Sequence, residues 1–468
     1  MHNCVKLLHK GTYLNRIFLK CQTLSCLANI SQQTTASSQH RNYSNKYIHE
    51  RAAEDLAVHK FGGDHRQRKH RVYVWGYAMT GSLGVPTFIK PKPRVPVRKK
   101  QTAPYLLYFD EKISDVACGY GFSLFSSNSL SSSKLWGTGI NTDTQIGYHE
   151  KQVNRGKNLE YVIAPAEIHL PLKTPRSTRV IQVACGRAHS LVLTDQEGVF
   201  SLGNNAYGQC GRKVIEDENY SCNMRIHNIS GIEGKIKKIV CGQDHSLFLT
   251  ESGQVLSCGW GADGQTGRGD YTSSSEVGLI LGDLKGETIV DVATYADCCL
   301  AVSDKGDVFG WGNSEYNQLR LVTDETQIAE PRRLPLKDVG RVVSVATGGT
   351  VCALLNDSGD VYVWGYGILG KGPKLSESKR PEPIPAILFG RRELKEHIKV
   401  TRIFCGMHHF AALTSDGDLY TWGQNSHGSL GLGIHLDQYF PLKVGVPAEV
   451  IDVACGVDHM IALAKTFI

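Results

Sequence analysis

The chain has 468 residues, with 52 Lys or Arg against 45 Asp or Glu, so its formal net charge is +7. With 41% hydrophobic residues, 21% charged residues and 49 glycines, it is too apolar for a disordered chain and too rich in glycine for a helical bundle. No stretch approaches the roughly 18 apolar residues that a membrane-spanning helix needs, so we expect a soluble, globular body. The 14 cysteines form no C-x-x-C pair, which favours buried, reduced thiols over a disulfide scaffold or zinc knuckles.

Residues 1–49 have the composition of an organelle-targeting presequence. They contain no Asp or Glu, and Ser, Thr, Leu and Phe are common. Their cations are Lys6, Lys10, Arg16, Lys20, Arg41 and Lys46. A secretory signal would instead gather its apolar residues in one block. The bond between Tyr43 and Ser44 resembles the arginine-directed site of the matrix processing peptidase. We predict a mitochondrial presequence over residues 1–43 and a linker over residues 44–70, with a disordered tail as the alternative.

A run of cations and prolines spans residues 90–100, within a stretch from His65 to Phe109 that has no acidic residue. Its cations are Lys90, Lys92, Arg94, Arg98, Lys99 and Lys100. Prolines keep such a run extended and outside central strands, and cations on a stiff loop can neutralise several phosphates. We interpret this basic segment as a candidate contact for RNA or a ribosome. The alternatives are a solvated loop without a partner, or a contact for an acidic protein or an anionic lipid.

Two short sequence units alternate along residues 71–468. The first reads V-x-V-A-C-G-x-x-H-S-L-x-L-T, and its cysteine position is held by Cys118, Cys185, Cys241, Thr294, Thr347, Cys405 and Cys455. The second reads V-Y-x-W-G-x-N-x-x-G-Q-L-G, and we place its central glycine at Gly76, Gly137, Gly203, Gly259, Gly312, Gly365 and Gly423. Apolar and β-branched residues between glycine turns predict short antiparallel strands, about four for each pair of units.

Tryptophans mark one position of the second unit. Five of the six share it, namely Trp75, Trp136, Trp311, Trp364 and Trp422. The sixth, Trp260, follows Cys258 at that position by two residues, which would let it face the same side of a strand. Large aromatic side chains at a fixed repeat position predict packing between neighbouring sheets.

The repeat series begins with a second-type unit, residues 71–84, and ends with a first-type unit, residues 450–464. Pairing these two would complete a seventh sheet and leave no open edge in the ring. A linear solenoid would need capping repeats, which the sequence lacks. We therefore predict an all-β fold, a seven-bladed β-propeller closed by pairing of its N-terminal and C-terminal strands.

These units resemble those of the regulator of chromosome condensation repeat family, whose members form seven-bladed propellers. Two departures, N-Q-L-R at residues 317–320 and G-I-L-G-K at residues 367–371, are similar to a mitochondrial branch of that family. The resemblance implies a protein of the mitochondrial matrix or the inner membrane. It also implies guanine nucleotide exchange on the inner-membrane fusion dynamin-like GTPase and a role in large-subunit ribosomal RNA maintenance.

Cys–His pairs with a spacing of four residues raise the question of a metal. They are Cys185 with His189, Cys241 with His245, Cys405 with His409, and Cys455 with His459. Zinc needs four ligands at one point, whereas each unit offers two, and threonine replaces the cysteine in two units. We assign these pairs to packing and expect neither a metal nor a cofactor.

Residues 365–371 satisfy both G-x-G-x-x-G and G-x-x-x-x-G-K, the patterns of nucleotide-binding loops. Gly372 and Pro373 follow, however, where a phosphate-binding loop needs Ser or Thr and the start of a helix. We read this stretch as a turn of no special role or as an exposed protein-contact loop. The candidate contact residues are Tyr366, Ile368, Leu369 and Lys371.

The sequence has no nucleophile elbow and no carboxylate pair at a spacing typical of hydrolases, so we expect no catalytic residues. The expected protein is a monomeric, non-catalytic propeller. Its expected partners are the mitochondrial dynamin-like GTPase, large-subunit mitochondrial rRNA and the factors that process this rRNA, with peripheral inner-membrane association. The alternatives are an interaction scaffold without exchange activity, and a propeller enzyme.

Overall fold

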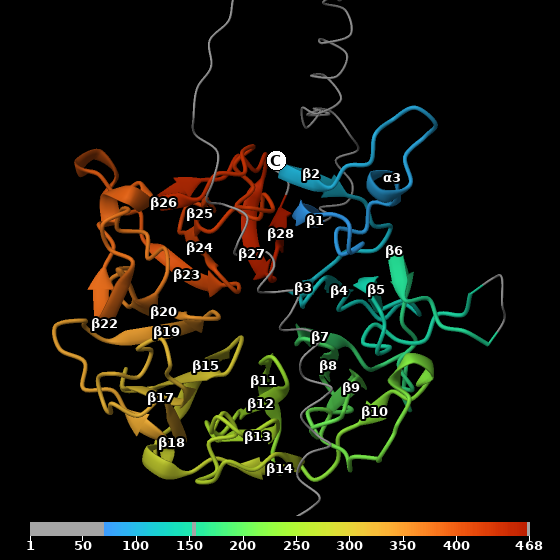
Figure 1. Ribbon diagram of the computed structural model, residues 1–468, viewed down its shortest axis with the longest axis horizontal. Helices are drawn as coiled ribbons and strands as arrows, with labels where there is room; N and C mark the ends of the chain where they lie inside the picture. Colours follow the sequence, from blue (N-terminus) through green and yellow to red (C-terminus); the bar gives the residue numbers. More distant parts are fainter. Residues whose placement is uncertain (1–69, 152–155, 466–468) are drawn as a thin grey trace, which may run out of the picture. The chain divides into compact units, whose positions relative to one another are not determined.

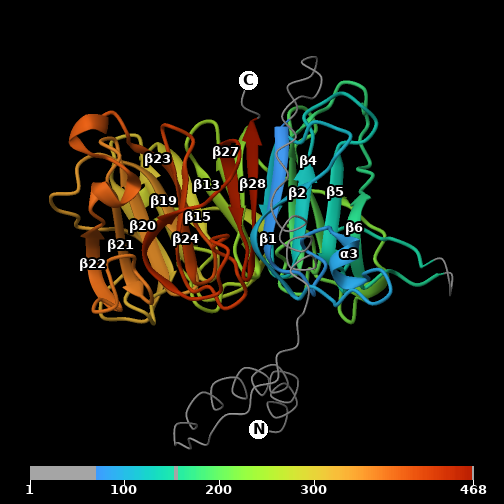
Figure 2. The same cartoon turned by 90° about the horizontal axis from the view of Figure 1, so that it is seen from above.

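The computed structural model describes residues 70–151 and 156–465. Within them, 28 strands form seven four-stranded antiparallel sheets that surround a common axis as blades (Figures 1 and 2). The predicted seven-bladed, all-β propeller is thereby confirmed. The predicted presequence, the Tyr43–Ser44 cleavage site and the linker up to residue 69 lie outside the described residues.

Every blade has an inner, a second, a third and an outer strand, and blades 1 to 6 follow one another along the chain from β3 to β26. The inner strands are β3 (Asp115–Cys118), β7 (Val180–Cys185), β11 (Ile236–Cys241), β15 (Ile289–Thr294), β19 (Val342–Thr347), β23 (Val400–Cys405) and β27 (Glu449–Cys455). The second strands are β4 (Phe122–Ser126), β8 (His189–Thr194), β12 (His245–Thr250), β16 (Cys298–Ser303), β20 (Val351–Asn356), β24 (His409–Thr414) and β28 (His459–Lys465). The third strands are β5 (Leu135–Ile140), β9 (Val199–Gly203), β13 (Val255–Gly259), β17 (Val308–Asn313), β21 (Val361–Tyr366), β25 (Leu419–Gly423) and β1 (His70–Tyr77). The outer strands are β6 (Tyr161–Glu167), β10 (His227–Asn228), β14 (Ser274–Leu279), β18 (Gln327–Arg333), β22 (Glu377–Pro383), β26 (Gln438–Lys443) and β2 (Lys100–Leu107).

Within residues 70–151 and 156–465, the helical segments are short and lie in the connections. They are α3 (Pro86–Ile89) and the 3₁₀ turns η1 (Tyr220–Cys222), η2 (Gly282–Leu284), η3 (Ala386–Phe389) and η4 (Glu393–Lys395). None of the helices in the described residues is long and apolar enough to cross a bilayer.

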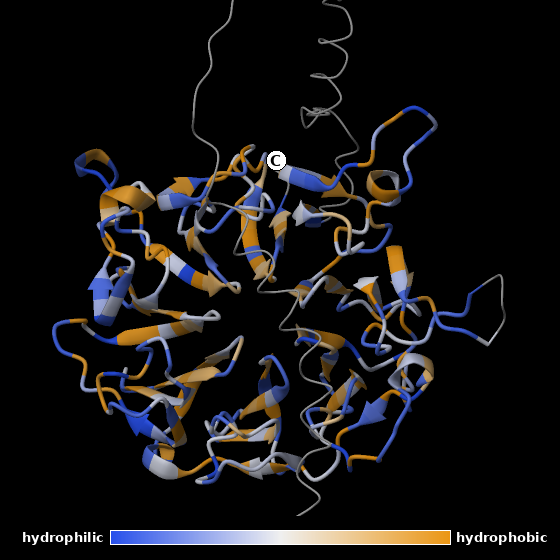
Figure 3. Cartoon of the chain, in the orientation of Figure 1, coloured by the Kyte–Doolittle hydropathy of each residue, from blue (hydrophilic) through white to orange (hydrophobic). Residues whose placement is uncertain are grey.

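The seventh sheet, which we call the closing blade, is shared by the two ends of the repeat series. Its strand order is β2-β1-β28-β27, and β1 pairs antiparallel with β28 from His70↔Lys465 to Gly76↔His459. This register confirms the predicted ring closure. Second strands such as β8 and β16 are buried along their whole length, whereas outer strands such as β18 and β22 are mostly hydrophilic (Figure 3).

Strand register corrects the repeat assignment in blade 1. The glycine of the second unit pairs with the first residue of the second strand, as Gly203 does with His189. In blade 1 the partner of Phe122 is Gly139, not Gly137. Gly139 has φ +111°, and a Cβ there would approach the Cα of Phe122 to 2.5 Å. Glycine is therefore required at residue 139, and the predicted position was wrong by two residues.

Strand register also changes two of the tryptophan assignments. Thr138 holds the tryptophan position of blade 1, because it directly precedes Gly139. Trp136 lies two residues earlier and packs edge-on against Phe109, with ring centroids 5.9 Å apart. Trp260 follows the end of β13, and buried Cys258 fills the shared position in blade 3. The shared position is thus occupied by tryptophan in four blades.

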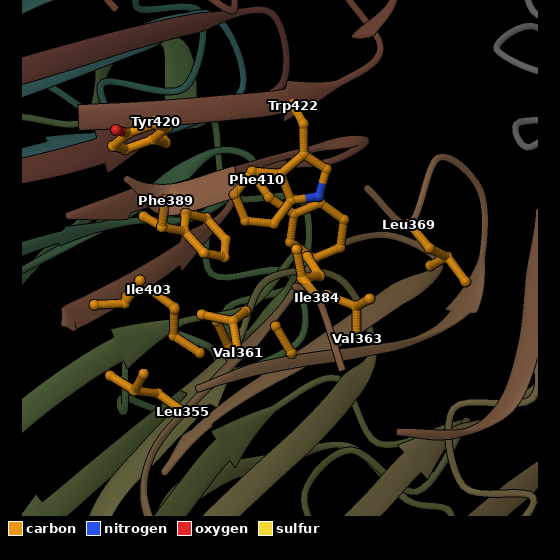
Figure 4. Close-up of a cluster of buried hydrophobic side chains, with 14 of the residues drawn as sticks. Leu355, Val361, Val363, Leu369, Ile384, Phe389, Ile403, Phe410, Tyr420 and Trp422 are labelled. Carbon is orange, nitrogen blue, oxygen red and sulfur yellow. The ribbon is translucent and has the colours of Figure 1, made fainter. Parts of the chain in front are cut away.

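The shared tryptophans fill the space between blades. In Figure 4, Trp422 of blade 6 stacks on Phe410 and lies over Val363, Leu369 and Ile384 of blade 5. All five side chains are buried. Adjacent blades therefore share one apolar core, and the tryptophan ring joins the two sheets.

Three tryptophans also bond to the preceding blade. The indole Nε1 of Trp75, Trp311 and Trp364 donates to the carbonyl oxygen of Ser429, Gln265 and Gln318, at 2.7, 3.0 and 2.7 Å. The Nε1 of Trp422 is buried and has no partner in the described residues. The connection after β21 that would supply its acceptor is shorter than its counterparts.

Replacing these tryptophans by phenylalanine separates packing from hydrogen bonding. Trp364→Phe loses packing and leaves the carbonyl of Gln318 without its indole donor, so we expect an extra loss of about 1–3 kcal/mol in the free energy of unfolding. Trp422→Phe loses packing but also removes an unpaired donor. It should therefore lower the free energy of unfolding by less than the first variant does. Urea denaturation of both variants measures the difference. Equal losses would show that the indole bond contributes nothing.

Candidate functional site

One end of the propeller collects two sets of connections. In every blade a backbone N–H at the end of the third strand donates to a carbonyl in the turn between the inner and second strands, at 2.8 to 2.9 Å. Asn204 N–H, for example, donates to Ala188 O, and Gln424 N–H to His408 O. We call this end the turn face. The connections from third to outer strands, including the basic segment, emerge there.

The Nε2 of His409 has no partner among the described residues, whereas the other three histidines of the Cys–His pairs link neighbouring blades. Their Nε2 atoms lie 3.1 Å from Ser246 Oγ for His189, 3.1 Å from Thr294 Oγ1 for His245, and 2.9 Å from Ser123 Oγ for His459. Burial lowers the pKa of His189 and of His245 to about 3, so both rings are neutral. No three metal-binding side chains gather at one point in the part of the chain that the structure describes.

Two tyrosines meet near the propeller axis on the turn face. Tyr120 of blade 1 stacks on Tyr295 of blade 4, with ring centroids 5.8 Å apart. Because these blades are not neighbours, the rings must reach across the axis. The Tyr120 hydroxyl donates to Gln243 Oε1 at 3.4 Å. The Tyr295 hydroxyl is buried and finds no partner among the described residues.

Buried carboxylates surround these rings. Asp244 accepts from Arg187 at both oxygens, at 2.6 Å from Nη2 and 3.1 Å from Nε. Asp297 accepts from Gln265 Nε2 at 2.8 Å. Burial, with the nearby Asp263 and Asp244 carboxylates, raises the pKa of Asp297 to about 6, and burial also raises the pKa of Asp244. We call Tyr120, Arg187, Gln243, Asp244, Tyr295 and Asp297 the axial cluster. Carboxylates with shifted pKa values concentrate at functional sites, which makes this cluster the candidate contact surface.

A second set of polar side chains lies on the inner strands. These residues were not among those predicted from the sequence. Each stands three residues before the shared cysteine position: Asp115, Gln182, Lys238, Asp291, Ser344, Arg402 and Asp452. Most contact the next blade. The Asp115 carboxylate accepts from Val183 N at 2.7 Å, and the Lys238 ammonium donates to Asp291 at 2.5 Å. The only sequence signal for this polar ring is a polar residue at one position of an otherwise apolar strand.

Like charges meet in this ring where blade 1 adjoins the closing blade. Asp115 of β3 faces Asp452 of β27, which pairs with Arg402 at 2.8 Å. Burial, and to a lesser extent the Asp452 carboxylate, raises the pKa of Asp115 to about 8. The Val183 and Val116 N–H groups and Arg402 act in the opposite direction. The Asp115 carboxyl therefore takes up a proton on folding near neutral pH.

This uptake makes stability depend on pH. Because the folded pKa exceeds the unfolded one, the free energy of unfolding falls as pH rises from about 4 to 8, by at most roughly 1.4 kcal/mol per pH unit. Asp115→Asn, which keeps an acceptor for Val183 N–H, should remove this contribution. Urea denaturation at pH 6 and pH 8 should show a smaller difference for the variant than for the parent chain. If the variant and the parent chain showed the same difference between pH 6 and pH 8, Asp115 would not be the source of the pH dependence.

The basic segment joins α3 to β2 and projects from the closing blade (Figure 1). Two cations near its C-terminal end contact the propeller. Arg98 lies over the Phe88 ring at 4.8 Å and donates to Gln101 Oε1 at 2.8 Å. Lys100 donates to Ser426 O at 2.6 Å. The remaining cations, Lys90, Lys92, Arg94 and Lys99, are exposed. Four of the six predicted contact residues are therefore available at the surface.

In the candidate protein-contact loop, too, only some of the predicted residues are exposed. Tyr366 is 50% exposed, but Leu369 is fully buried in the core between blades 5 and 6. Lys371 pairs with Glu382 at 2.9 Å, and Ile368 is half-buried. Leu369 is therefore not accessible for the predicted partner contact, because it holds the leucine position of the G-Q-L-G motif, which is buried in other blades as Leu319 and Leu430.

These features define a β-propeller whose candidate polar contact surface lies on its turn face. Comparison with known proteins gives its family. The model of the RCC1-like domain matches residues 66–350 and, in a second match, residues 233–467. The chain therefore belongs to the RCC1-like domain family.

Its relatives are similar over nearly the whole chain. An RCC1-like G exchanging factor-like protein of Mus musculus is 55% identical over 424 residues, which covers 89% of this chain and 92% of the relative. The Homo sapiens protein of the same name is also 55% identical, over 88% of this chain and 91% of its own. The crystal structure of human WBSCR16 superposes with a TM-score of 0.81 at 56% identity and covers 86% of this chain and all of that one. Saccharomyces cerevisiae Prp20p, at 21% identity, shares the fold with a TM-score of 0.69.

Proposed function

We propose that this protein is a non-catalytic guanine nucleotide exchange factor of mitochondria. Its target is the dynamin-like GTPase that fuses inner membranes, and the protein resides in the matrix or at the matrix side of the inner membrane. The similarity to proteins named as exchange-factor-like, along nearly the whole chain, supports this class. The target and the compartment rest on the family resemblance and on the composition of residues 1–43.

The axial cluster is the observation that carries the proposal. Exchange requires no covalent chemistry: the factor must bind the nucleotide-free GTPase more tightly than the GDP-bound form. The axial cluster offers aromatic rings and partly desolvated carboxylates at one end of a rigid ring, which suits tight protein binding. Its carboxylates complement a partner surface that presents Lys or Arg.

Release of fluorescent GDP from the dynamin-like GTPase tests this proposal. The chain should accelerate release at least tenfold, and Asp297→Asn should weaken that acceleration several-fold because it removes a partner charge. Asp416→Asn, in a turn at the opposite end of the propeller, is the matched control and should leave release unchanged. Failure of the unmodified chain to accelerate release at saturating concentration would refute exchange activity.

We also propose a scaffold role in large-subunit rRNA maintenance and ribosome biogenesis, because the basic segment exposes four cations. Cations on a projecting loop bind phosphates without sequence preference and lose affinity as salt rises. Large-subunit rRNA and its processing factors are the proposed partners. This role does not depend on the axial cluster.

Ultraviolet crosslinking of RNA in intact mitochondria tests the scaffold role. A variant with Lys90, Lys92, Arg94 and Lys99 changed to Gln should lose most crosslinks to large-subunit rRNA, whereas Arg98 is kept because it packs on Phe88. The matched control changes four exposed lysines elsewhere, Lys213, Lys285, Lys337 and Lys395, and should keep the crosslinks. Absence of rRNA above background in the parent chain would exclude direct RNA contact.

A further inference from the structure

The tip of the basic segment, residues 92–97, combines cations with exposed aliphatic side chains. Val95 is 55% exposed and Val97 is 43% exposed. Every residue from 90 to 100 is Lys, Arg, Pro or Val, so the segment has none of the Ser, Asn, Asp or Gly typical of solvated turns. Single exposed valines are ordinary, but two of them flanked by cations and prolines form an amphipathic tip.

The base of the segment is fixed to the closing blade. Arg98 N–H donates to Phe88 O at 2.9 Å, and Ala78 N–H donates to Lys99 O at 2.9 Å. Val95 N–H donates to Lys92 O at 3.1 Å, which closes a turn at the tip. The prolines further restrict the free conformations. A tip that is already ordered loses little entropy when it docks.

This chemistry favours an anionic bilayer over RNA as the occupant of the tip. RNA binding would use the cations, but the segment offers no aromatic ring for base stacking and no amide or hydroxyl side chain for base edges. Contact with RNA would also leave both valines in water. At a bilayer surface the valines leave water among the headgroups while the surrounding cations meet lipid phosphates.

We propose that the basic segment docks this protein onto an anionic phospholipid bilayer, with Val95 and Val97 inserted at the headgroup level. Lys90, Lys92, Arg94 and Lys99 then neutralise lipid phosphates. Arg98 and Lys100 hold the segment to the propeller. This inference is independent of the proposed exchange activity, because it uses neither the axial cluster nor a GTPase. It is an alternative to the proposed rRNA contact, which would use the same four cations.

Lipid photocrosslinking on the full chain tests the insertion. Phosphatidylcholine vesicles containing about 20 mol% cardiolipin and a diazirine phospholipid are photolysed with the protein, and the labelled peptides are mapped by mass spectrometry. We expect label on residues 92–97 with cardiolipin and little without it. Mapping separates this label from any on residues 1–43, which are also cationic.

Two variants separate insertion from charge. Val95→Ser with Val97→Ser should lower the label on the segment roughly tenfold. Neutralising the four exposed cations should lower it at least roughly a hundredfold, since each cation contributes about fivefold at an anionic surface. Val214→Ser with Ile215→Ser, which removes two aliphatic side chains of similar exposure, is the matched control and should retain the label.

Three results would overturn the proposal. Vesicles that bind the protein without labelling residues 92–97 would place the membrane contact elsewhere. Unchanged label after loss of both valines would show that the cations act without insertion. RNA crosslinks on the segment in intact mitochondria, with no lipid label there, would make RNA its occupant.

Discussion

Seven blades form a ring only if one sheet is shared between distant parts of the chain, and the pairing of β1 with β28 provides that sheet. Residues 70–76 and 459–465 add one continuous antiparallel ladder, so neither end of the repeat series leaves an open edge. Closure also holds blades that are not neighbours opposite one another. The axial cluster uses this arrangement, because Tyr120 of blade 1 meets Tyr295 of blade 4 across the axis.

Contacts between blades run in both directions around this ring. His189, His245 and His459 reach into the following blade, whereas Trp75, Trp311 and Trp364 donate to the preceding one. The polar ring of the inner strands adds a third set near the axis. Since all three sets use side chains at fixed repeat positions, a link found in one blade recurs in several others. The place where like charges meet, Asp115 with Asp452, lies beside the closing blade.

The repeat period was sufficient to predict strands, blades and closure, because each unit encodes one local structure. It failed in blade 1, where the Trp136-Gly137 dipeptide imitates the motif that Thr138-Gly139 occupies. The axial cluster and the polar ring were not predictable, because their members lie tens of residues apart and meet only in the folded ring. The burial of Leu369, by contrast, follows from the repeat itself, since Leu369 holds the same motif position as Leu319 and Leu430, which are also buried.

The two surfaces to which we assign partners are both at the turn face. The axial cluster lies at the centre of that face, and the basic segment leaves the same end at the outer strand of the closing blade. A GTPase seated on the axial cluster would therefore lie on the side from which the segment projects. For a target anchored in a membrane, a segment that holds the propeller at the bilayer would raise the local concentration of exchange factor without any contact to the GTPase itself. The rigid ring fixes the separation of the two surfaces, so docking through one orients the other.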